Sequence, residues 1–160
     1  MVTALRLRLM TATEFESFRM RLVHDYAADH VRAGTWSIEE AETRAGEQTS
    51  ELLPDGPDTD GMLLLTAEDE EGQPVGVLWL SLTHPQGATD TAWIYDIEVV
   101  AKRRGEGYGR ALLCAAEHEV RRRGIGTLGL NVFGDNDAAR TLYQSAGYEV
   151  VTQQMRKRLS

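Results

Sequence analysis

The chain has 160 residues, of which 42% are hydrophobic, 26% are charged and only four are proline. These values are typical of a soluble globular protein with one packed core, and they exclude a fibrous or disordered chain. The formal net charge of −8 argues against broad binding to nucleic acids or anionic membranes, because phosphate groups are bound mainly through Lys and Arg. We therefore expect one domain over residues 1–160 with no nucleic-acid or membrane partner.

Residues 2–9 predict a half-buried strand, because apolar and polar side chains alternate along them. The side chains expected to face the core are Leu5, Leu7 and Leu9. The segment TATE then fits a capping box, in which a threonine hydroxyl and Glu14 bond the first turn of a helix that runs to about Arg32. A second capping box at Ser37 opens a surface helix that ends before Pro54.

The rest of the chain predicts strands in alternation with helices, which together indicate a mixed α/β domain. The expected strands cover residues 61–68, 74–83, 91–101, 127–133 and 148–159, and the first two of these form a hairpin. The expected helices run from Ala111 to the RRRG segment at 121–124 and over residues 137–147.

Cys114 is the only cysteine, and it cannot form an intramolecular disulfide. The sequence has no charged-then-apolar leader and no long apolar run, so we expect a cytoplasmic protein. Cys114 lies in the apolar part of a predicted helix, where packing is a more typical role than nucleophilic attack. The four histidines lack metal-ligand spacing, so we expect no metal site.

Three alternating glycines, Gly105, Gly107 and Gly109, lie between a predicted strand and a predicted helix. Backbone N–H groups in such a turn can bind an anion, and the helix start adds roughly half a positive charge. A plain glycine-rich connector is the alternative. The segment lacks the Gly-Lys-Ser/Thr of a P-loop, and Arg110 stands where the dinucleotide fingerprint needs its third glycine.

Two motifs resemble those of the GNAT superfamily of N-acetyltransferases. The segment RGEGYG, from Arg104 to Gly109, fits the Q/R-x-x-G-x-G/A loop that binds the pyrophosphate of acyl-CoA in that family. Asn131 ends the next strand, and Asn136 opens NDAARTLYQSAGY, which fits N-x-x-A-x-x-L-Y-x-x-x-G-[FY]. The resemblance covers residues 73–158. It implies the single-domain GNAT fold of the α+β type: a mixed, mostly antiparallel sheet of six to seven strands with about four helices, whose fourth and fifth strands splay apart around the pantetheine arm.

The resemblance also implies acetyl-CoA as the acyl donor, bound largely by backbone groups. The backbone of residues 97–99 would pair with the pantetheine amides like an added strand, and that of residues 105–110 would bind the pyrophosphate. Asn136 would bond the cofactor arm, although it equally suits a helix N-cap. The residues implied to bind the cofactor are Ile97, Glu98, Val99, Arg104, Gly105, Glu106, Gly107, Tyr108, Gly109, Arg110, Asn131, Asn136 and Tyr143.

Tyr143 is implied to be the general acid that protonates the departing CoA thiolate, and a buried aromatic side chain is its alternative role. A phenol with a pKa of about 10 can donate to a thiolate whose thiol has a pKa of about 8.5. Glu98 is the candidate base for the attacking amine, and Asp96 shares its face of the strand. Some relatives carry Glu where this chain has Asn131, which cannot act as a base, so Asp96 and water also remain open.

The implied activity is transfer of an acetyl group from acetyl-CoA to a primary amine by direct attack in a ternary complex. The acidic first helices favour a small cationic acceptor, although an acidic surface also keeps a protein soluble, and peptide amines remain open. A catalytically inactive acyl-CoA-binding module is the alternative function. A homodimer is compatible with the resemblance.

Overall fold

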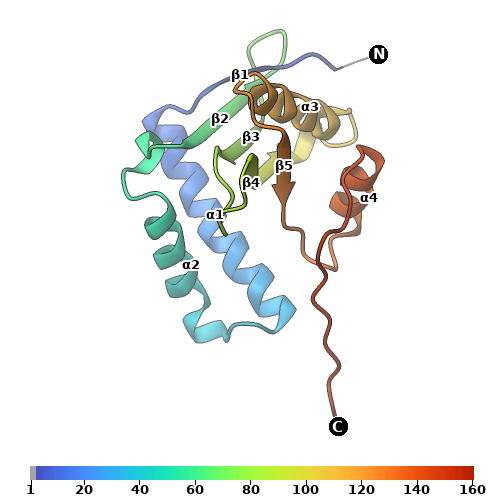
Figure 1. The fold of residues 1–160 in the computed structure, drawn as a ribbon. Coiled ribbons are helices and arrows are strands. Elements are labelled where there is room, and N and C mark those ends of the chain that lie inside the picture. The colour runs from blue at the N-terminus through green and yellow to red at the C-terminus, as the bar shows by residue number, and fades with distance from the viewer. Residues whose placement is uncertain (1–2) are drawn as a thin grey trace.

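A five-stranded sheet lies between two layers of helices in the computed structural model, which describes residues 3–160 (Figure 1). The strands are β1 (Arg6–Leu9), β2 (Met62–Glu68), β3 (Pro74–Ser81), β4 (Thr91–Val99) and β5 (Thr127–Leu130). The helices are α1 (Ala12–Ala33), α2 (Ile38–Leu52), α3 (Tyr108–Arg121) and α4 (Asp137–Ser145), and short 3-10 turns cover Gly56–Asp58 and Ala101–Arg103. The strands follow chain order across the sheet, antiparallel except for β5, which runs parallel to β4. The predicted α/β class is confirmed.

Two apolar clusters hold the helical layers on opposite faces of the sheet. On one face, Leu65 of β2 packs in a cluster with Leu112 of α3. On the other, Leu64 and Trp79 pack with Phe18 of α1, and the rings of Trp79 and Phe18 meet edge to face with centroids 6.2 Å apart. Neighbouring strand residues point to opposite faces, so the nearly continuous apolar runs of β2 and β3 fill both clusters.

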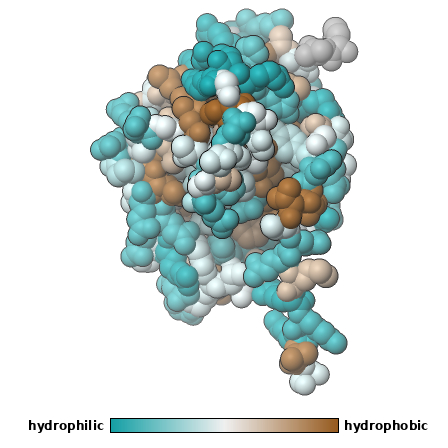
Figure 2. All heavy atoms as spheres, in the orientation of Figure 1, coloured by the Kyte–Doolittle hydropathy of each residue, from teal (hydrophilic) through white to brown (hydrophobic). Residues whose placement is uncertain are grey.

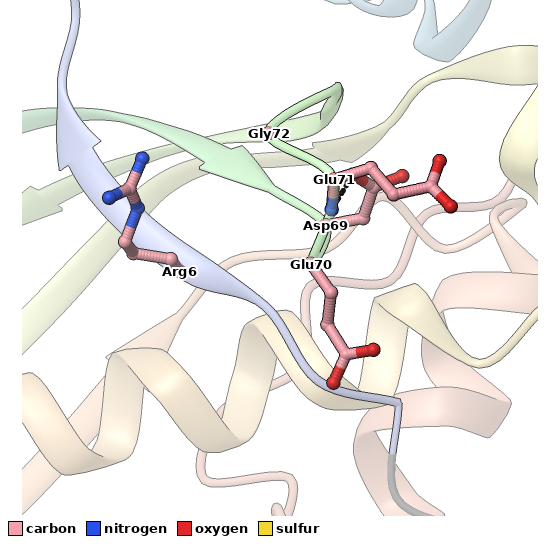
Figure 3. Close-up of a pocket in the computed structure, with 5 residues that line it drawn as sticks. All are labelled: Arg6, Asp69, Glu70, Glu71 and Gly72. Atoms are coloured by element: carbon pink, nitrogen blue, oxygen red, sulfur yellow. Dashed lines mark hydrogen bonds between the residues drawn. The ribbon is translucent and has the colours of Figure 1, made fainter.

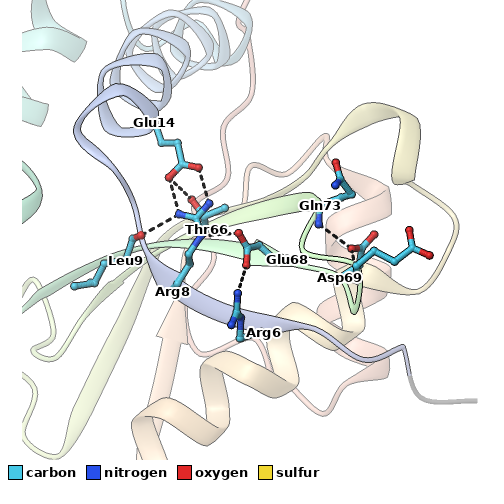
Figure 4. Close-up of polar contacts among 9 residues, drawn as sticks. Arg6, Arg8, Leu9, Glu14, Thr66, Glu68, Asp69 and Gln73 are labelled. Carbon is cyan, nitrogen blue, oxygen red and sulfur yellow. Dashed lines mark hydrogen bonds and ion pairs between the residues drawn. The ribbon is translucent and has the colours of Figure 1, made fainter.

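An ion-pair network ties β1 and β2 to the first turn of α1 (Figure 4). Arg8 donates to both oxygens of Glu14, each at 2.8 Å, and to Glu68 at 2.6 Å. Thr66 donates to Glu14 at 3.2 Å, and Arg6 donates to the other oxygen of Glu68 at 2.7 Å. Hydrogen bonding from Arg8 lowers the pKa of Glu14 to about 2. Glu14 is therefore charged at neutral pH and clamps the helix start onto the sheet.

The predicted helix starts are confirmed in part. Thr11 and Glu14 form a complete capping box, in which the Glu14 N–H donates to the Thr11 hydroxyl at 3.2 Å and the Thr11 N–H donates to Glu14 at 2.8 Å. Ser37 is the N-cap of α2, but its side chain makes no capping hydrogen bond. Helix α3 begins at Tyr108 rather than at Ala111, because the glycine turn passes directly into it.

The prediction that Leu9 faces the core is wrong. Leu5 and Leu7 do pack against the core, but Leu9 is 66% exposed. The alternation ends there because Met10 turns inward and its N–H donates to the carbonyl of Leu64 at 2.9 Å.

Within residues 3–160 the sheet has five strands, so the predicted count of six to seven is wrong. Strand β5 ends at Leu130 rather than at residue 133, and residues 148–159, predicted as the final strand, form no strand. The final segment keeps its extended conformation but runs away from the sheet (Figure 1). A strand needs a neighbouring edge to pair with, and this segment pairs with none of the strands in the described residues.

The substitution Glu14→Gln should lower the free energy of unfolding by about 1–2 kcal/mol at pH 7, because it removes a charged acceptor from Arg8. The native pKa of Glu14 lies below the ordinary value of 4.5, so its contribution is complete above that pH and is lost as the pH falls toward 2. Urea unfolding at pH 7 and pH 3 measures both effects. Glu16→Gln, at an exposed position on the same helix, is the control and should change little.

The substitution Gly76→Ala should destabilise the sheet by about 1–3 kcal/mol, because the new methyl group would overpack it. That methyl would lie 2.5 Å from the carbonyl oxygen of Glu98 and 2.8 Å from the side chain of Leu112. Gly46→Ala is the matched control: Gly46 lies inside α2 with nothing within 4 Å of the new methyl, so the change should stabilise by up to about 1 kcal/mol. Equal effects in chemical unfolding would contradict the packing argument.

Candidate functional site

The glycine turn bends the chain between β4 and α3. Gly105 and Gly107 have φ of +80° and +90°, a region that glycine adopts far more readily than other residues. The first helical hydrogen bond runs from the Ala111 N–H to the carbonyl of Gly107 at 3.1 Å. Among the described residues, the N–H groups of residues 105–110 find no acceptor, and a methyl group on Gly105 would meet no atom within 4 Å. These unpaired donors at a helix start suit the phosphates predicted there.

Arg103 links the glycine turn to the β2–β3 hairpin. Its guanidinium donates to the hydroxyl of Tyr108 at 2.7 Å, and to Asp69 and Glu106, each at 3.0 Å. Tyr108 is only 7% exposed, so its side chain does not face solvent. The sequence pattern does not reveal the role of Arg103, because Asp69 lies far away in the chain, on the β2–β3 hairpin.

A hollow beside this hairpin is acidic and does not suit phosphate groups (Figure 3). It is lined by Arg6, Asp69, Glu70, Glu71 and Gly72. Asp69 accepts hydrogen bonds from the N–H groups of Glu71 and Gln73, at 3.0 and 2.9 Å, and thereby shapes the hairpin turn. Three carboxylates against one guanidinium repel an anion, so the glycine turn is the better phosphate site.

Strands β4 and β5 part after the pair Ile94 and Leu130. Their pairing begins at Thr91 and stops at Ile94, while β4 continues to Val99. Residues 95–99 therefore have β3 along one side and a free edge along the other, which leads to the glycine turn. A ligand arm that carries amide groups can pair with such an edge as an added strand would.

A bulge at Tyr95 turns the carboxylates of β4 toward α1. Ile94 and Asp96 oppose consecutive residues of β3, so Tyr95 is an extra residue between them. Ile94 lies in the cluster under α3, whereas Tyr95 stacks on Trp79 on the opposite face with ring centroids 4.6 Å apart. Because of the extra residue, Asp96 follows on the same face as Tyr95, and Glu98 joins it two residues later.

Arg21 of α1 gathers three carboxylates. Its guanidinium donates to Asp96 at 3.0 Å, pairs with Glu98, and lies 3.5 Å from Asp25 one turn along the same helix. Arg104 donates to the other oxygen of Glu98 at 3.2 Å. The structure thus places Asp96 and Glu98 together, and it adds Arg21, which the sequence analysis missed. The only sequence signal for Arg21 is its position beside the apolar face of α1.

Asp96 is a more basic carboxylate than an exposed one. Burial raises the pKa of Asp96 to about 6, and the charge of Arg21 opposes part of that rise. Its side chain is 20% exposed. A carboxyl group with this pKa is mostly ionised at pH 7, yet it holds a proton more firmly than an exposed carboxylate does.

Tyr143 lies half-buried on α4 and packs against the cluster under α3. Burial raises the pKa of Tyr143, and the negative charge of Asp96 raises it further. The phenol is therefore protonated at neutral pH and able to donate. Its ring also packs near that of Tyr148, with the two ring centroids 6.0 Å apart. Packing involves the ring and proton donation involves the hydroxyl, so one side chain can have both roles.

The other predicted contact residues surround the free edge and the turn. The side chains of Ile97 and Val99 pack against the core, so only their backbone can face the gap beside β4. Arg104 is exposed and donates to the carbonyl of Val99 at 3.2 Å. Arg110 is held by the hydroxyl of Ser145, to which it donates at 2.6 Å, and this bond joins the start of α3 to α4.

Asn136 is the N-cap of α4, and its side-chain oxygen accepts a hydrogen bond from the Ala139 N–H at 3.2 Å. The predicted capping role is therefore present, and the role toward the cofactor remains a prediction. Asn131 is exposed just after the end of β5. An ion pair between Arg32 and Asp135 joins the end of α1 to the loop that carries Asn136.

The prediction that Cys114 packs in the interior is wrong, because its side chain is exposed on α3. The apolar face of α3 instead buries Leu112, Leu113 and Ala116, and Cys114 lies outside that face. Within residues 3–160, no group of three or more His, Cys, Asp or Glu side chains is placed to hold a metal ion. In the same part of the chain, no helix combines the length and apolar character needed to cross a membrane.

Comparison with known proteins agrees with this geometry. The chain is 34% identical over 150 residues to the uncharacterized N-acetyltransferase YycN of Bacillus subtilis, and the match covers 94% of this chain and 96% of YycN. It is 32% identical over 158 residues to YdgE of the same organism, another uncharacterized N-acetyltransferase, with 98% and 99% covered. A mycothiol acetyltransferase of Kytococcus sedentarius is 34% identical over 123 residues, which are 76% of this chain and 38% of that protein.

Solved structures and the family profile lead to the same conclusion. The crystal structure of YycN superposes with a TM-score of 0.91 at 33% identity and covers 98% of this chain and 99% of that chain. The PaiA N-acetyltransferase of Thermoplasma acidophilum, solved with coenzyme A, shares the fold with a TM-score of 0.67 at 19% identity, over 94% and 93% of the two chains. The profile described as "Acetyltransferase (GNAT) family" matches residues 20–148. The chain therefore belongs to the GNAT family of N-acetyltransferases.

Proposed function

We propose that this GNAT acetyltransferase moves an acetyl group from acetyl-CoA to a primary amine by direct attack within a ternary complex. The observation that carries the proposal is the free edge of β4 at residues 95–99, which joins the carboxylates of Asp96 and Glu98 to the glycine turn. A pantetheine arm paired with this edge would bring its thioester beside the carboxylates, while its pyrophosphate lies on the N–H groups of residues 105–110.

In the proposed reaction the amine nitrogen forms a bond to the acetyl carbon, and the carbon–sulfur bond breaks. The proton of the amine passes to a carboxylate, and the CoA thiolate takes a proton from the phenol of Tyr143. Asp96 is better suited to be the base than Glu98, because Glu98 already accepts from both Arg21 and Arg104. Glu98 stays the second candidate, and Asn136 is proposed to bond the cofactor arm.

The charge around Arg21 supports a small, cationic acceptor. Three carboxylates, those of Asp25, Asp96 and Glu98, face two guanidiniums, those of Arg21 and Arg104, so the cluster keeps one negative charge in excess. An acceptor that carries a positive charge besides its reacting amine would offset this excess negative charge. The similarity to proteins named mycothiol acetyltransferase also supports a small-molecule acceptor over a peptide. We place this reaction in the cytoplasm.

The variant Tyr143→Phe should lower kcat by about 10²-fold and leave the Kd for acetyl-CoA within about twofold, because it removes a proton donor but keeps the ring. Release of CoA thiol across a panel of polyamines, aminoglycosides and amino acids gives the rate, and calorimetry with acetyl-CoA gives the affinity. Full activity in the variant would show that Tyr143 has a packing role and is not the acid. Binding of acetyl-CoA by the wild-type chain with no turnover on any amine would favour the inactive acyl-CoA-binding module instead.

The ratio of wild-type to Asp96→Asn kcat/KM should rise with pH through about 6 and then level off, because the base must be ionised and its pKa is about 6. The ionisation of the amine acceptor is common to both proteins and cancels in the ratio. Glu98→Gln is the matched control: it keeps Asp96, so its own kcat/KM should still depend on the pKa near 6, and the ratio of wild type to this variant should stay flat there. If instead the ratio for Glu98→Gln rises with pH and the ratio for Asp96→Asn stays flat, the role of base belongs to Glu98.

A further inference from the structure

The end of α1 holds the loop of residues 131–136, which joins β5 to α4 (Figure 1). The ring of His30 meets that of Phe133 edge to face, with the ring centroids 5.3 Å apart. Two residues further along each segment, the guanidinium of Arg32 donates to Asp135. The loop begins where β5 leaves the sheet, so side-chain contacts with α1 restrain it in place of strand pairing.

Phe133 is bonded in turn to Asn136, the residue proposed to contact the cofactor arm. The N–H of Asn136 donates to the carbonyl of Phe133 at 3.0 Å. The side-chain oxygen of Asn136 caps α4, whereas its NH2 group makes no hydrogen bond to the described residues and can donate to a ligand. Movement of Phe133 away from α1 would therefore move this donor.

His30 lies within an aromatic cluster. Its ring stacks on that of Trp36 with the centroids 3.7 Å apart, and the ring of Tyr26 meets it edge to face at 4.5 Å. Trp36 is buried. Figure 2 shows mostly hydrophilic atoms over the lower ends of α1 and α2, so the rings pack beneath a polar surface.

The two ring nitrogens of His30 have different surroundings. Nδ1 lies 2.6 Å from the hydroxyl oxygen of Thr35. Nε2 is buried and has no hydrogen-bond partner among the described residues. A protonated imidazole carries an N–H on both nitrogens. Protonation would therefore place a charged donor among aromatic rings with no acceptor for it, which is costly.

Two cations near the cluster oppose a further positive charge. Arg44 of α2 lies over the ring of Trp36, 4.9 Å from its centroid, and its charge lowers the pKa of His30. Arg156 of the C-terminal segment lies against Gly34, just after the end of α1. Both guanidiniums disfavour an imidazolium at this position.

Two carboxylates, Asp29 of α1 and Asp135 of the loop, act in the opposite direction. Both accept hydrogen bonds from Arg32, so their negative charge is largely offset. Burial outweighs the attraction of Asp29 and lowers the pKa of His30 below its ordinary value of 6.5. The docked imidazole is therefore neutral at pH 7.

We propose that His30 is a positioning residue for the cofactor site: its neutral ring holds Phe133 and thereby keeps Asn136 in place, and its protonation releases the loop. This inference rests on the proposed contact between Asn136 and the cofactor arm. Docking is complete above pH 6.5 and weakens as the pH falls below that value, because the released ring takes up a proton more readily than the docked one. Affinity for acetyl-CoA falls with it.

Amide NMR spectra of the free protein test the first step. Between pH 8 and pH 5, the backbone amides of residues 133–136 should shift with the midpoint of the His30 ring, which lies below 6.5. His30→Phe keeps an aromatic ring that cannot titrate, so the same amides should stay still; His30→Gln serves if that variant does not fold. The bond from Arg32 lowers the pKa of Asp135, whose titration therefore falls below this range.

His24→Phe is the matched control for the NMR titration. The His24 side chain is 74% exposed on the same helix, and its replacement should leave the pH-dependent shifts of the loop unchanged. Loop amides that shift equally in His30→Phe, or that follow a midpoint other than that of His30, would overturn the proposal.

Calorimetry with acetyl-CoA tests the second step. The ratio of the wild-type Kd to the His30→Phe Kd should be near one at pH 7.5 and rise by about threefold or more at pH 5.5. The ionisation of the cofactor is common to both proteins and cancels in the ratio. A ratio that stays flat would show that His30 does not position the cofactor site.

A further variant separates this result from a failure of the proposed function. Asn136→Ser removes the NH2 group but keeps a side-chain oxygen for the N-cap. If it leaves the Kd for acetyl-CoA unchanged, the contact of Asn136 with the cofactor is wrong, and the role of His30 falls with it. If it weakens binding while the ratio for His30→Phe stays flat, only the role of His30 is wrong.

Discussion

The register of β4 is the constraint on which the rest of the site depends. Regular alternation after Ile94 would turn Asp96 into the apolar cluster under α3, and Ile97 would face α1 in its place. The extra residue at Tyr95 prevents this. It keeps Ile97 in the core and presents two carboxylates to Arg21. A single bulge thus satisfies the hydrophobic core and the polar site at once.

The same strand explains how the free edge proposed to bind the cofactor arises. β4 is held on one side by β3 over nearly its full length, so it stays extended after β5 has left it. Because only the short 3-10 turn Ala101–Arg103 separates β4 from the glycine turn, the position of the turn relative to the carboxylates is set by ordered backbone and not by a long loop.

The sequence predicts the elements whose signals are local. The capping box at Glu14, the hairpin of β2 and β3, and the glycine turn each depend on residues close together in the chain, and all are found. The GNAT motifs likewise lie within single turns and helices. Local patterns miss the residues whose roles depend on partners distant in sequence. Arg21 has its role because it bonds Asp96, and Arg103 because it bonds Asp69.

The errors have the same cause. Leu9 has the right alternation, but the strand ends at that residue, and Cys114 lies just outside the apolar face of its helix. The segment 148–159 has the alternation of a strand but pairs with none of the described strands. Periodicity shows which side of an element is apolar, whereas the neighbour that covers it is a property of the whole fold.

The contacts of Arg103 have a consequence for the thermodynamics of cofactor binding. By fixing Tyr108, Glu106 and the β2–β3 hairpin together, Arg103 orders the glycine turn before any ligand arrives. Freezing a backbone residue costs about 1–2 kcal/mol in conformational entropy, and a turn that is ordered during folding does not lose that entropy again when phosphate binds. In the proposed binding mode, the hairpin thereby helps to set the affinity for the acyl donor.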